Sequence, residues 1–359
     1  MKTKSITILC LFIASVVYGQ KITAFKENAT GFIGFKDNGK IIIQPTKYTE
    51  WEGYSEGLIV VGDKKDKWGF IDLQGNEVIE LQYKYATKFF DGLACVAVKK
   101  GKYGYIDKTG AKIIDFVFEN AHPFNENTAG VSQNNKWGFI DKTGKIILDY
   151  KYQAVYPFIE GFAAARLNDK WGFIDKTGKE IGSFKYAGAQ RFSEGFGIVV
   201  LNGKWTFIDK TGKEIIDPTY ESISHFKEGF AAVRLESRYG YIDNTGKLIT
   251  EIKYSSVEDF KDGFAIVKYA GGYSFDNNYS FIDKTGKEIP LERYNSIKKF
   301  SLNYFMINDM LGKKGIVTKE GKKIIEMNYD KISMADGVFT AVDANGIIFK
   351  FDKEGKMIN

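Results

Sequence analysis

The sequence predicts an all-β protein built from about ten tandem repeats of roughly 34 residues each. A turn glycine recurs along almost the whole chain at nearly constant spacing. The segments between turns are rich in Val, Ile, Phe and Tyr and are bounded by Gly, Asn, Asp and Thr, a composition typical of short strands. No segment of helical length shows an apolar period of about 3.6 residues, so nothing indicates helices.

The turn glycine ends stretches such as Asp-Lys-Thr-Gly. Its ten positions are Gly39, Gly75, Gly110, Gly144, Gly178, Gly212, Gly246, Gly286, Gly321 and Gly355. Successive intervals are 36, 35, 34, 34, 34, 34, 40, 35 and 34 residues. In such turns the Asp side chain accepts backbone N–H hydrogen bonds and the glycine supplies a positive φ. The repeated Asp and Gly are therefore predicted to shape turns.

An aromatic residue followed by glycine precedes most of these turns. The structural repeat motif is predicted at Trp68, Gly69, Trp137, Gly138, Trp171, Gly172 and Trp205, with the turn glycines Gly144, Gly178 and Gly212. A glycine in a strand lets a neighbouring backbone or ring approach closely. Because a unit of about 34 residues is too small to bury its own core, we expect the tryptophans to be buried against the next copy.

A second signature lies upstream of the first in each copy: an aromatic residue, two further residues, usually Gly, then small and branched residues. It is clearest in "FIEGFAAARL" from Phe158, "FSEGFGIVVL" from Phe192, "FKEGFAAVRL" from Phe226 and "FKDGFAIVKY" from Phe260. Each copy is therefore expected to form three strands, exemplified by 230–235, 171–175 and 214–220.

Two arrangements of the copies fit this pattern. In an open solenoid or superhelical array, each copy touches only its neighbours. In a closed β-propeller, the small-residue strand would be innermost, where crowding favours Ala and Gly. Ten copies exceed the usual four to eight blades of a propeller, so the open array is the favoured prediction.

The motif "KWGFIDKTGK", at 136–145 and again at 170–179, resembles the repeats of the WG-repeat (KWG repeat) family of bacterial exported proteins. The resemblance implies tandem β-rich repeats with a binding or scaffolding role, and it implies no catalytic residues. The end copies, 20–50 and 290–359, depart from the motif, as in "FIGFKDNGK", and are expected to be degenerate or capping copies.

The first 19 residues have the features of a secretory signal peptide. Lys2 and Lys4 are followed by an apolar run at 6–17 that is too short to span a bilayer. Small residues lead to a cleavage site before Gln20. The repeat domain would then be 20–359, in a protein located in the periplasm, at the cell surface or outside the cell. No later apolar run has the length of a transmembrane segment.

Composition excludes several kinds of function. The formal net charge is +6, and removing Lys2 and Lys4 leaves 6 − 2 = +4, too little to indicate a nucleic-acid partner. His122 and His225 lie near no nucleophile motif or metal-ligand spacing. No catalytic residue, metal or cofactor is predicted, and Cys95 is expected to be a buried, inert thiol.

One copy breaks the regular spacing. The interval from Gly246 to Gly286 is longer because of extra residues near "YAGGYSFDNNY", and insertions in repeat proteins often form the binding face. Tyr273, Phe275 and Asp276 are the candidate binding residues there, and the alternative is a hairpin extension without a binding role. The partner is predicted to be a protein or another envelope ligand. The alternatives are a carbohydrate- or cell-wall-binding accessory protein and a hydrolase with an unrecognised site.

We predict that the mature chain begins at Gln20. Cleavage there removes the apolar run that directs export. Intact-mass measurement of the exported protein checks this, and a mature form that retains Met1 would contradict the export argument.

Overall fold

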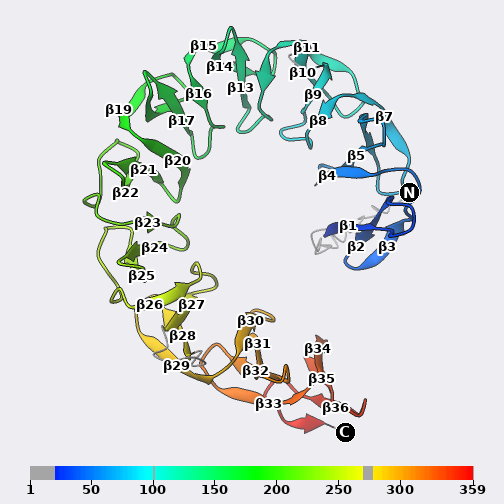
Figure 1. The fold of residues 1–359 in the computed structure, drawn as a ribbon, viewed down its shortest axis with the longest axis vertical. Helices are drawn as coiled ribbons and strands as arrows, with labels where there is room; N and C mark the ends of the chain where they lie inside the picture. The colour runs from blue at the N-terminus through cyan, green and yellow to red at the C-terminus, as the bar shows by residue number, and fades with distance from the viewer. Residues whose placement is uncertain (1–20, 100–101, 270–277, 359) are drawn as a thin grey trace, which may run out of the picture. The chain divides into compact units, whose positions relative to one another are not determined.

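The computed structural model describes residues 21–99, 102–269 and 278–358, and every regular element in these ranges is a β-strand. The strands form nine antiparallel sheets, each an open meander of strands consecutive in sequence (Figure 1). The predicted all-β, tandem-repeat fold class is confirmed. Within the same ranges no helix is long and apolar enough to cross a membrane.

The chain divides into two compact units, which are described separately: 1–135 with 139–146, and 136–138 with 147–359. The first unit contains copies one to three and part of copy four. Copy one is β1 (Ile22–Lys26), β2 (Ile33–Asp37) and β3 (Lys40–Ile43); copy two is β4 (Glu50–Ser55), β5 (Leu58–Gly62), β6 (Trp68–Ile71) and β7 (Glu77–Tyr83); copy three is β8 (Tyr85–Ala86), β9 (Ala94–Lys99), β10 (Lys102–Ile106) and β11 (Lys112–Phe118); copy four is β12 (Asn120–Ala121), β13 (Thr128–Gln133), β14 (Lys136–Asp141) and β15 (Ile146–Tyr152).

The second unit contains the later copies. Copy five is β16 (Ala154–Val155), β17 (Phe162–Leu167), β18 (Lys170–Asp175) and β19 (Glu180–Tyr186); copy six is β20 (Gly188–Ser193), β21 (Phe196–Leu201) and β22 (Lys204–Ile208); copy seven is β23 (Ser222–Ile223), β24 (Phe230–Leu235) and β25 (Arg238–Asp243); copy eight is β26 (Tyr254–Val257), β27 (Phe264–Tyr269), β28 (Asn278–Asp283) and β29 (Glu288–Arg293). Copy nine is β30 (Ser296–Lys299), β31 (Tyr304–Asn308), β32 (Lys314–Thr318) and β33 (Lys323–Tyr329); copy ten is β34 (Lys331–Ala335), β35 (Val338–Val342), β36 (Ile348–Phe351) and β37 (Met357–Ile358).

Most copies contain four strands instead of the predicted three. The extra strand comes first, and in copies three to five it has two residues, as in β16, which pairs only two residues with β17. The predicted third strand at 214–220 is wrong, because copy six has only isolated bridges there, Ile208 with Glu214 and Trp205 with Tyr220. Pro218 has no N–H to contribute to a ladder, and Thr219 N–H donates instead to the carbonyl of Asp217, at 2.8 Å.

The Asp-Lys-Thr-Gly turns have the predicted chemistry. Asp175 Oδ1 accepts from the backbone N–H of Thr177 at 2.8 Å, from that of Lys179 at 3.0 Å and from the Thr177 hydroxyl at 2.6 Å. Gly178 has φ +83° and donates its N–H to the Asp175 carbonyl. In the equivalent turn of copy three, the hydroxyl of Thr109 and then backbone N–H groups lower the pKa of Asp107. The repeated acids therefore hold turns.

The glycine after Trp68 makes room for a bulge in the following strand. Trp68 pairs with Tyr83 and Phe70 pairs with Ile79, so two steps along β6 oppose four along β7. The extra backbone folds over Gly69, where a Cβ would lie 2.6 Å from the carbonyl oxygen of Ile79. The close approach predicted at this position is confirmed.

The rings buried between copies are mainly phenylalanines and tyrosines. All four motif tryptophans are half-buried, and Trp171 stacks on Tyr156 of its own copy. The fully buried ring is two residues further on, as with Phe173. The prediction that the tryptophans are the rings buried between copies is therefore wrong. The buried ring is the next one on the same strand face, two residues later.

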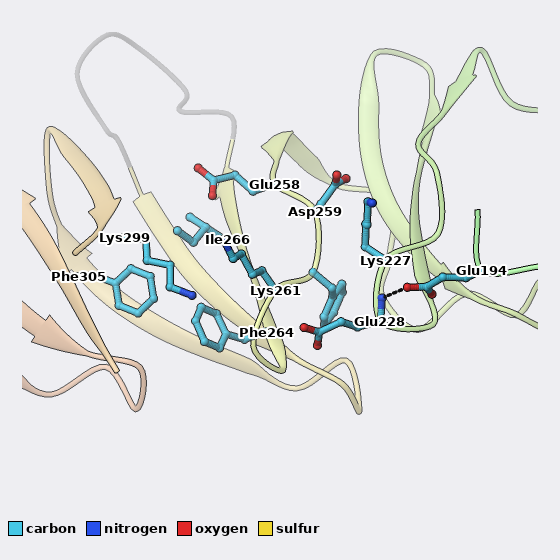
Figure 2. A pocket seen from close by; sticks show the side chains of 11 residues that line it. Glu194, Lys227, Glu228, Glu258, Asp259, Lys261, Phe264, Ile266, Lys299 and Phe305 are labelled. Carbon is cyan, nitrogen blue, oxygen red and sulfur yellow. Dashed lines mark hydrogen bonds between the residues drawn. The ribbon is translucent and has the colours of Figure 1, made fainter. Parts of the chain in front are cut away.

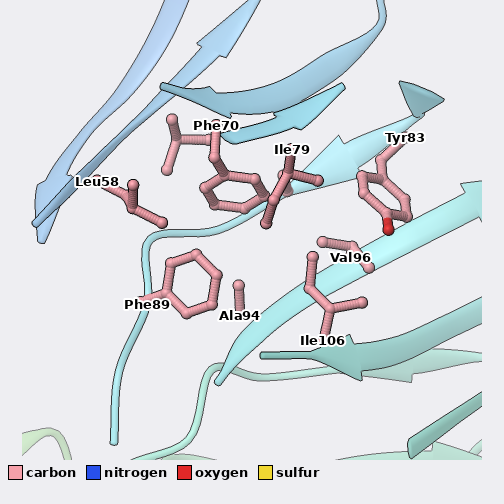
Figure 3. Packing of buried hydrophobic residues seen from close by; sticks show 10 residues of the cluster. Leu58, Phe70, Ile79, Tyr83, Phe89, Ala94, Val96 and Ile106 are labelled. Atoms are coloured by element: carbon pink, nitrogen blue, oxygen red, sulfur yellow. The ribbon is translucent and has the colours of Figure 1, made fainter. Parts of the chain in front are cut away.

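Each of these buried rings contacts a phenylalanine from the next copy. We call it the hairpin phenylalanine; it is the first residue of the F-x-x-G signature, or of its variant F-N-E-N in copy four. In copy three, Phe89 lies 4.8 Å from Phe70 of copy two, and Ala94 leaves room for it (Figure 3). The same pairing recurs at centroid distances of 4.6 to 5.1 Å for Phe124 with Tyr105, Phe192 with Phe173, Phe226 with Phe207 and Phe260 with Tyr241.

The main contacts between sheets within each unit join copies that follow one another in the chain. Examples are β7 with β9, β17 with β20, β19 with β21 and β32 with β34. This neighbour-to-neighbour packing is the arrangement predicted for an open tandem array. The end copies also form sheets, so departure from the motif has not abolished the fold there.

We predict that Gly69→Ala lowers the free energy of unfolding by about 1–3 kcal/mol, because the new methyl group must displace backbone. The matched control is Gly188→Ala, whose Cβ would lie 3.5 Å from Val200 at ordinary contact distance. The control should change stability by about 0.5 kcal/mol or less. Urea denaturation of both variants checks this, and equal stabilities would contradict the bulge account.

Candidate functional site

A ladder of carboxylates connects the hairpin turns of successive copies in the second unit. Both oxygens of Glu160 accept N–H hydrogen bonds, from Glu194 and Gly195 of the next turn, each at 2.7 Å. Glu194 does the same for Glu228 and Gly229, again at 2.7 Å. Each turn therefore binds the backbone of the turn that follows it.

The ladder explains why glutamate stands at a strained position. Glu160 has φ +53° and Gly161 φ +83°, in a two-residue hairpin whose flanking residues, Ile159 and Phe162, exchange both hydrogen bonds. This is the type I′ geometry, which prefers Asn, Asp and Gly. A left-handed residue with a side chain costs about 1–2 kcal/mol. Two charge-assisted hydrogen bonds to the next turn offset that cost.

The ladder ends where copy nine begins. Glu228 still accepts from Asp262 N–H at 2.6 Å and from Gly263 N–H at 2.9 Å. Copy nine has Ser-Leu-Asn at 301–303 in place of an acid-Gly turn, and Asp262 pairs instead with the Lys299 ammonium group. The change in turn sequence therefore removes one clamp between copies eight and nine.

The packing of aromatic rings changes at the same junction. In copy seven, the small residue Ala231 follows the hairpin and leaves space for the ring of the hairpin phenylalanine, Phe226. In copy nine, Phe305 stands at the position of Ala231. Phe305 fills the space itself, 4.7 Å from Phe281. Phe300, at the position of the hairpin phenylalanine, packs 6.2 Å from Phe339 of copy ten. The hairpin phenylalanine of copies six to eight packs against the preceding copy, whereas Phe300 packs against the following copy.

A cavity of about 620 Å³ lies at this junction (Figure 2). Its apolar surface comes from Phe260, Phe264, Ile266 and Phe305. Lys299 also lines the cavity, with its Nζ 6.0 Å from the centroid of the Phe264 ring. The remaining lining is charged: Glu194, Lys227, Glu228, Glu258, Asp259 and Lys261.

Some of the charged side chains at the cavity are bonded to other parts of the protein, and others have, within the described part of the chain, no ion-pair partner that would prevent them from binding a ligand. Glu194 and Glu228 accept turn N–H groups, and Lys284 Nζ lies 3.1 Å from Glu228. Among the described residues, Glu258 and Asp259 have no ion-pair partner. Burial, and then the neighbouring Asp259 carboxylate, raise the pKa of Glu258. The acidic pair would gain from a cation, and Lys227 and Lys261, which also line the cavity, have no ion-pair partner among the described residues either.

The acidic pair belongs to a position that varies strongly from copy to copy. We define the connector strip as the two residues before the hairpin phenylalanine, or before Phe300 in copy nine. Its members are Thr87-Lys88, His122-Pro123, Tyr156-Pro157, Gln190-Arg191, Ser224-His225, Glu258-Asp259 and Lys298-Lys299. Strip residues line both the cavity at copy nine and a smaller one that includes Tyr156, Arg191 and His225. Positions that vary on a repeated frame often form a binding face.

The sequence-based candidates Tyr273, Phe275 and Asp276 lie outside the described residues. The structure places His122 and His225 in the connector strip, and burial lowers the pKa of both. Cys95 is buried, and burial raises the pKa of its thiol to about 12, as expected for an inert thiol. Sequence reasoning missed the strip, although aligning the copies on the hairpin phenylalanine would have shown its variability.

In the ranges that the structure describes, no group of three or more His, Cys, Asp or Glu side chains is arranged to hold a metal ion. The recurrent acids are held in turns or in the ladder.

These features define a tandem β-repeat protein with a constant frame and a variable strip. The family described as "WG containing repeat" matches seven consecutive segments: 35–67, 68–103, 103–137, 137–171, 171–205, 205–239 and 239–273. The chain belongs to this family, as its Trp-Gly motifs indicated. No curated protein matches it.

Solved structures with a similar fold share little sequence with this chain. One described as a eukaryotic initiation factor has a TM-score of 0.52 and 10% identity, covering 85% of this chain and 95% of that one. BamB from Moraxella catarrhalis has a TM-score of 0.31 and 11% identity, covering 84% and 95%. The designed protein Ika8 has a TM-score of 0.36 and 14% identity, covering 86% and 96%. The first likeness supports a repeated all-β fold and nothing beyond it.

We predict that Glu194→Gln lowers the free energy of unfolding by about 1 kcal/mol, because the amide keeps the shape but loses the charge and one acceptor. The control is Glu180→Gln, an exposed glutamate with no hydrogen-bond partner among the described residues. The control should stay within about 0.5 kcal/mol of the wild type. Thermal denaturation of the two variants measures the difference, and equal melting temperatures would show that the ladder contributes nothing.

Proposed function

We propose that this protein is a non-catalytic, exported binding module that holds a protein partner of the cell envelope along the connector strip. The observation that carries the proposal is the contrast between a constant frame and a strip whose chemistry changes in every copy. The frame residues are occupied by turns, ring pairs and the ladder. The strip residues contribute little to these contacts and line both cavities.

The cavity at copy nine supports a protein partner over a small ligand. It combines an apolar floor, including Phe264 and Phe305, with the acidic pair Glu258-Asp259 on its rim. Apolar anchors surrounded by charged groups are typical of protein interfaces. The acidic pair favours a partner segment in which a basic residue adjoins an apolar side chain, since the cation would relieve the repulsion between the two carboxylates.

The non-catalytic and exported parts of the proposal rest on sequence features. The chain shows no nucleophile motif, and its N-terminal segment has the pattern of a signal peptide. A second candidate function is carbohydrate or cell-wall binding, which the 47% exposed ring of Tyr156 favours.

The proposal is tested by capture from envelope extracts of the source organism with immobilised mature protein. We predict that Glu258→Lys with Asp259→Lys reduces recovery of the bound protein at least tenfold, because repulsion replaces attraction at the strip. The control is Asp149→Lys with Glu180→Lys, which makes the same charge change at exposed residues outside the strip.

Equal recovery by both double variants would contradict a protein-binding role for the strip. Binding of the wild type to insoluble cell-wall material, with no protein retained, would favour the second candidate. Circular dichroism of each variant confirms that the fold is intact before recoveries are compared.

A further inference from the structure

A second, smaller cavity lies on the connector strip of copies five to seven. It has a volume of about 280 Å³, enough for a single ring-sized ligand. Tyr156 and Pro157 of copy five, Gln190 and Arg191 of copy six and His225 of copy seven line it. An aromatic ring, an amide, a guanidinium group and an imidazole therefore surround one small space.

The aromatic side of the cavity is rigid and exposed. Tyr156 retains 47% of its accessible surface, and its ring stacks on Trp171 with centroids 5.3 Å apart and an interplanar angle of 16°. Ile159 and Ala189 continue the apolar lining beside it. A ring fixed by stacking can support the C–H face of another ring at small entropic cost.

The basic group of the cavity is an arginine in a chain that rarely uses arginine. The chain has 51 Lys and Arg residues, of which five are Arg. Arg166 pairs with Asp169 at 3.0 Å and Arg234 with Glu221 at 3.8 Å. Arg191 is exposed and has no carboxylate partner among the described residues. A guanidinium group binds a carboxylate with two parallel hydrogen bonds, which an ammonium group cannot do.

Two further lining residues, His225 and Gln190, supply neutral hydrogen-bonding groups. Burial lowers the pKa of His225, and the positive charges of Arg191 and Lys227 lower it further, while Asp259 opposes them. The imidazole is therefore uncharged near neutral pH and offers one donor and one acceptor nitrogen. The Gln190 amide adds both kinds of group.

We propose that this cavity binds an acidic sugar, a pyranose ring that carries a carboxylate. The carboxylate binds the guanidinium group of Arg191, and the apolar face of the sugar lies against Tyr156. Sugar hydroxyls, which both donate and accept, meet the amide of Gln190 and the imidazole of His225. The site deepens the second candidate function and does not depend on protein binding at Glu258 and Asp259.

The test is calorimetric titration of the purified mature protein with a glucuronate oligosaccharide, with a glucose oligosaccharide of equal length, and with benzoate. We expect the glucuronate ligand to bind at least tenfold more tightly than either of the others. Arg191→Gln should weaken glucuronate binding at least tenfold, and Arg191→Lys should recover only part of it, because the ammonium group lacks the two-pronged geometry. Tyr156→Leu should also weaken binding.

The matched control is Arg238→Gln, which removes an arginine from β25 outside the cavity and should leave the dissociation constant unchanged. Equal affinity for glucose and glucuronate, or an unchanged affinity in Arg191→Gln, would overturn the proposal. Equal affinity for benzoate would overturn the assignment to a sugar. Melting temperatures exclude unfolding as the cause of any loss. Because the titration uses the purified protein and no envelope partner, its failure is distinguishable from failure of the capture experiment.

Discussion

The rest of the structure depends on one contact, the packing of the hairpin phenylalanine of each copy against a buried ring of the preceding copy. Phe192 contacts Phe173 of the copy before it, and neither ring is exposed. A copy of about 34 residues cannot form such a core alone. The remaining features serve this contact: the turns set the strand register, the glycine after tryptophan accommodates the bulge, and alanine or glycine on the receiving strand leaves space for the ring.

The junction of copies eight and nine shows how a repeat array can acquire an individual site without losing its fold. A phenylalanine on the strand, Phe305, keeps the buried ring pair with Phe281. Phe300, at the hairpin position, packs instead against Phe339 of copy ten, and a cavity lined by Lys299 lies at the junction. The change needs no new strand.

Much of the fold could be predicted from the sequence because the decisive signals are local. The turn at Asp175 and Gly178 follows from the hydrogen-bonding preference of Asp and the freedom of Gly. The failed strand at 214–220 shows where local pattern is insufficient, since Pro218 interrupts a segment that otherwise looks like its counterparts. The burial of Phe173 in place of Trp171 depends on which ring the next copy supplies, a tertiary fact that strand alternation does not contain.

The candidate site was less predictable, for a different physical reason. The glutamate at 160 is recognisable as a turn residue, yet its role as acceptor for the next turn requires the distance between two copies. The cavity at copy nine is lined by Phe305, which is larger than its counterparts Ala231 and Ala265. Such a substitution shows only when the copies are aligned and the neighbouring packing is known.

The neighbour-to-neighbour contacts have a consequence for how the protein opens. In a linear array, the cooperativity of unfolding depends on the individual interfaces between neighbouring copies. A weak interface divides the molecule into blocks whose amide hydrogens exchange independently. Copies five to eight are joined by both ring pairs and the carboxylate ladder, whereas copies eight and nine lack the second link. The junction of copies eight and nine therefore depends on ring packing and the ion pair of Asp262 with Lys299, so the cavity beside Phe305 lies at a weaker joint of the array.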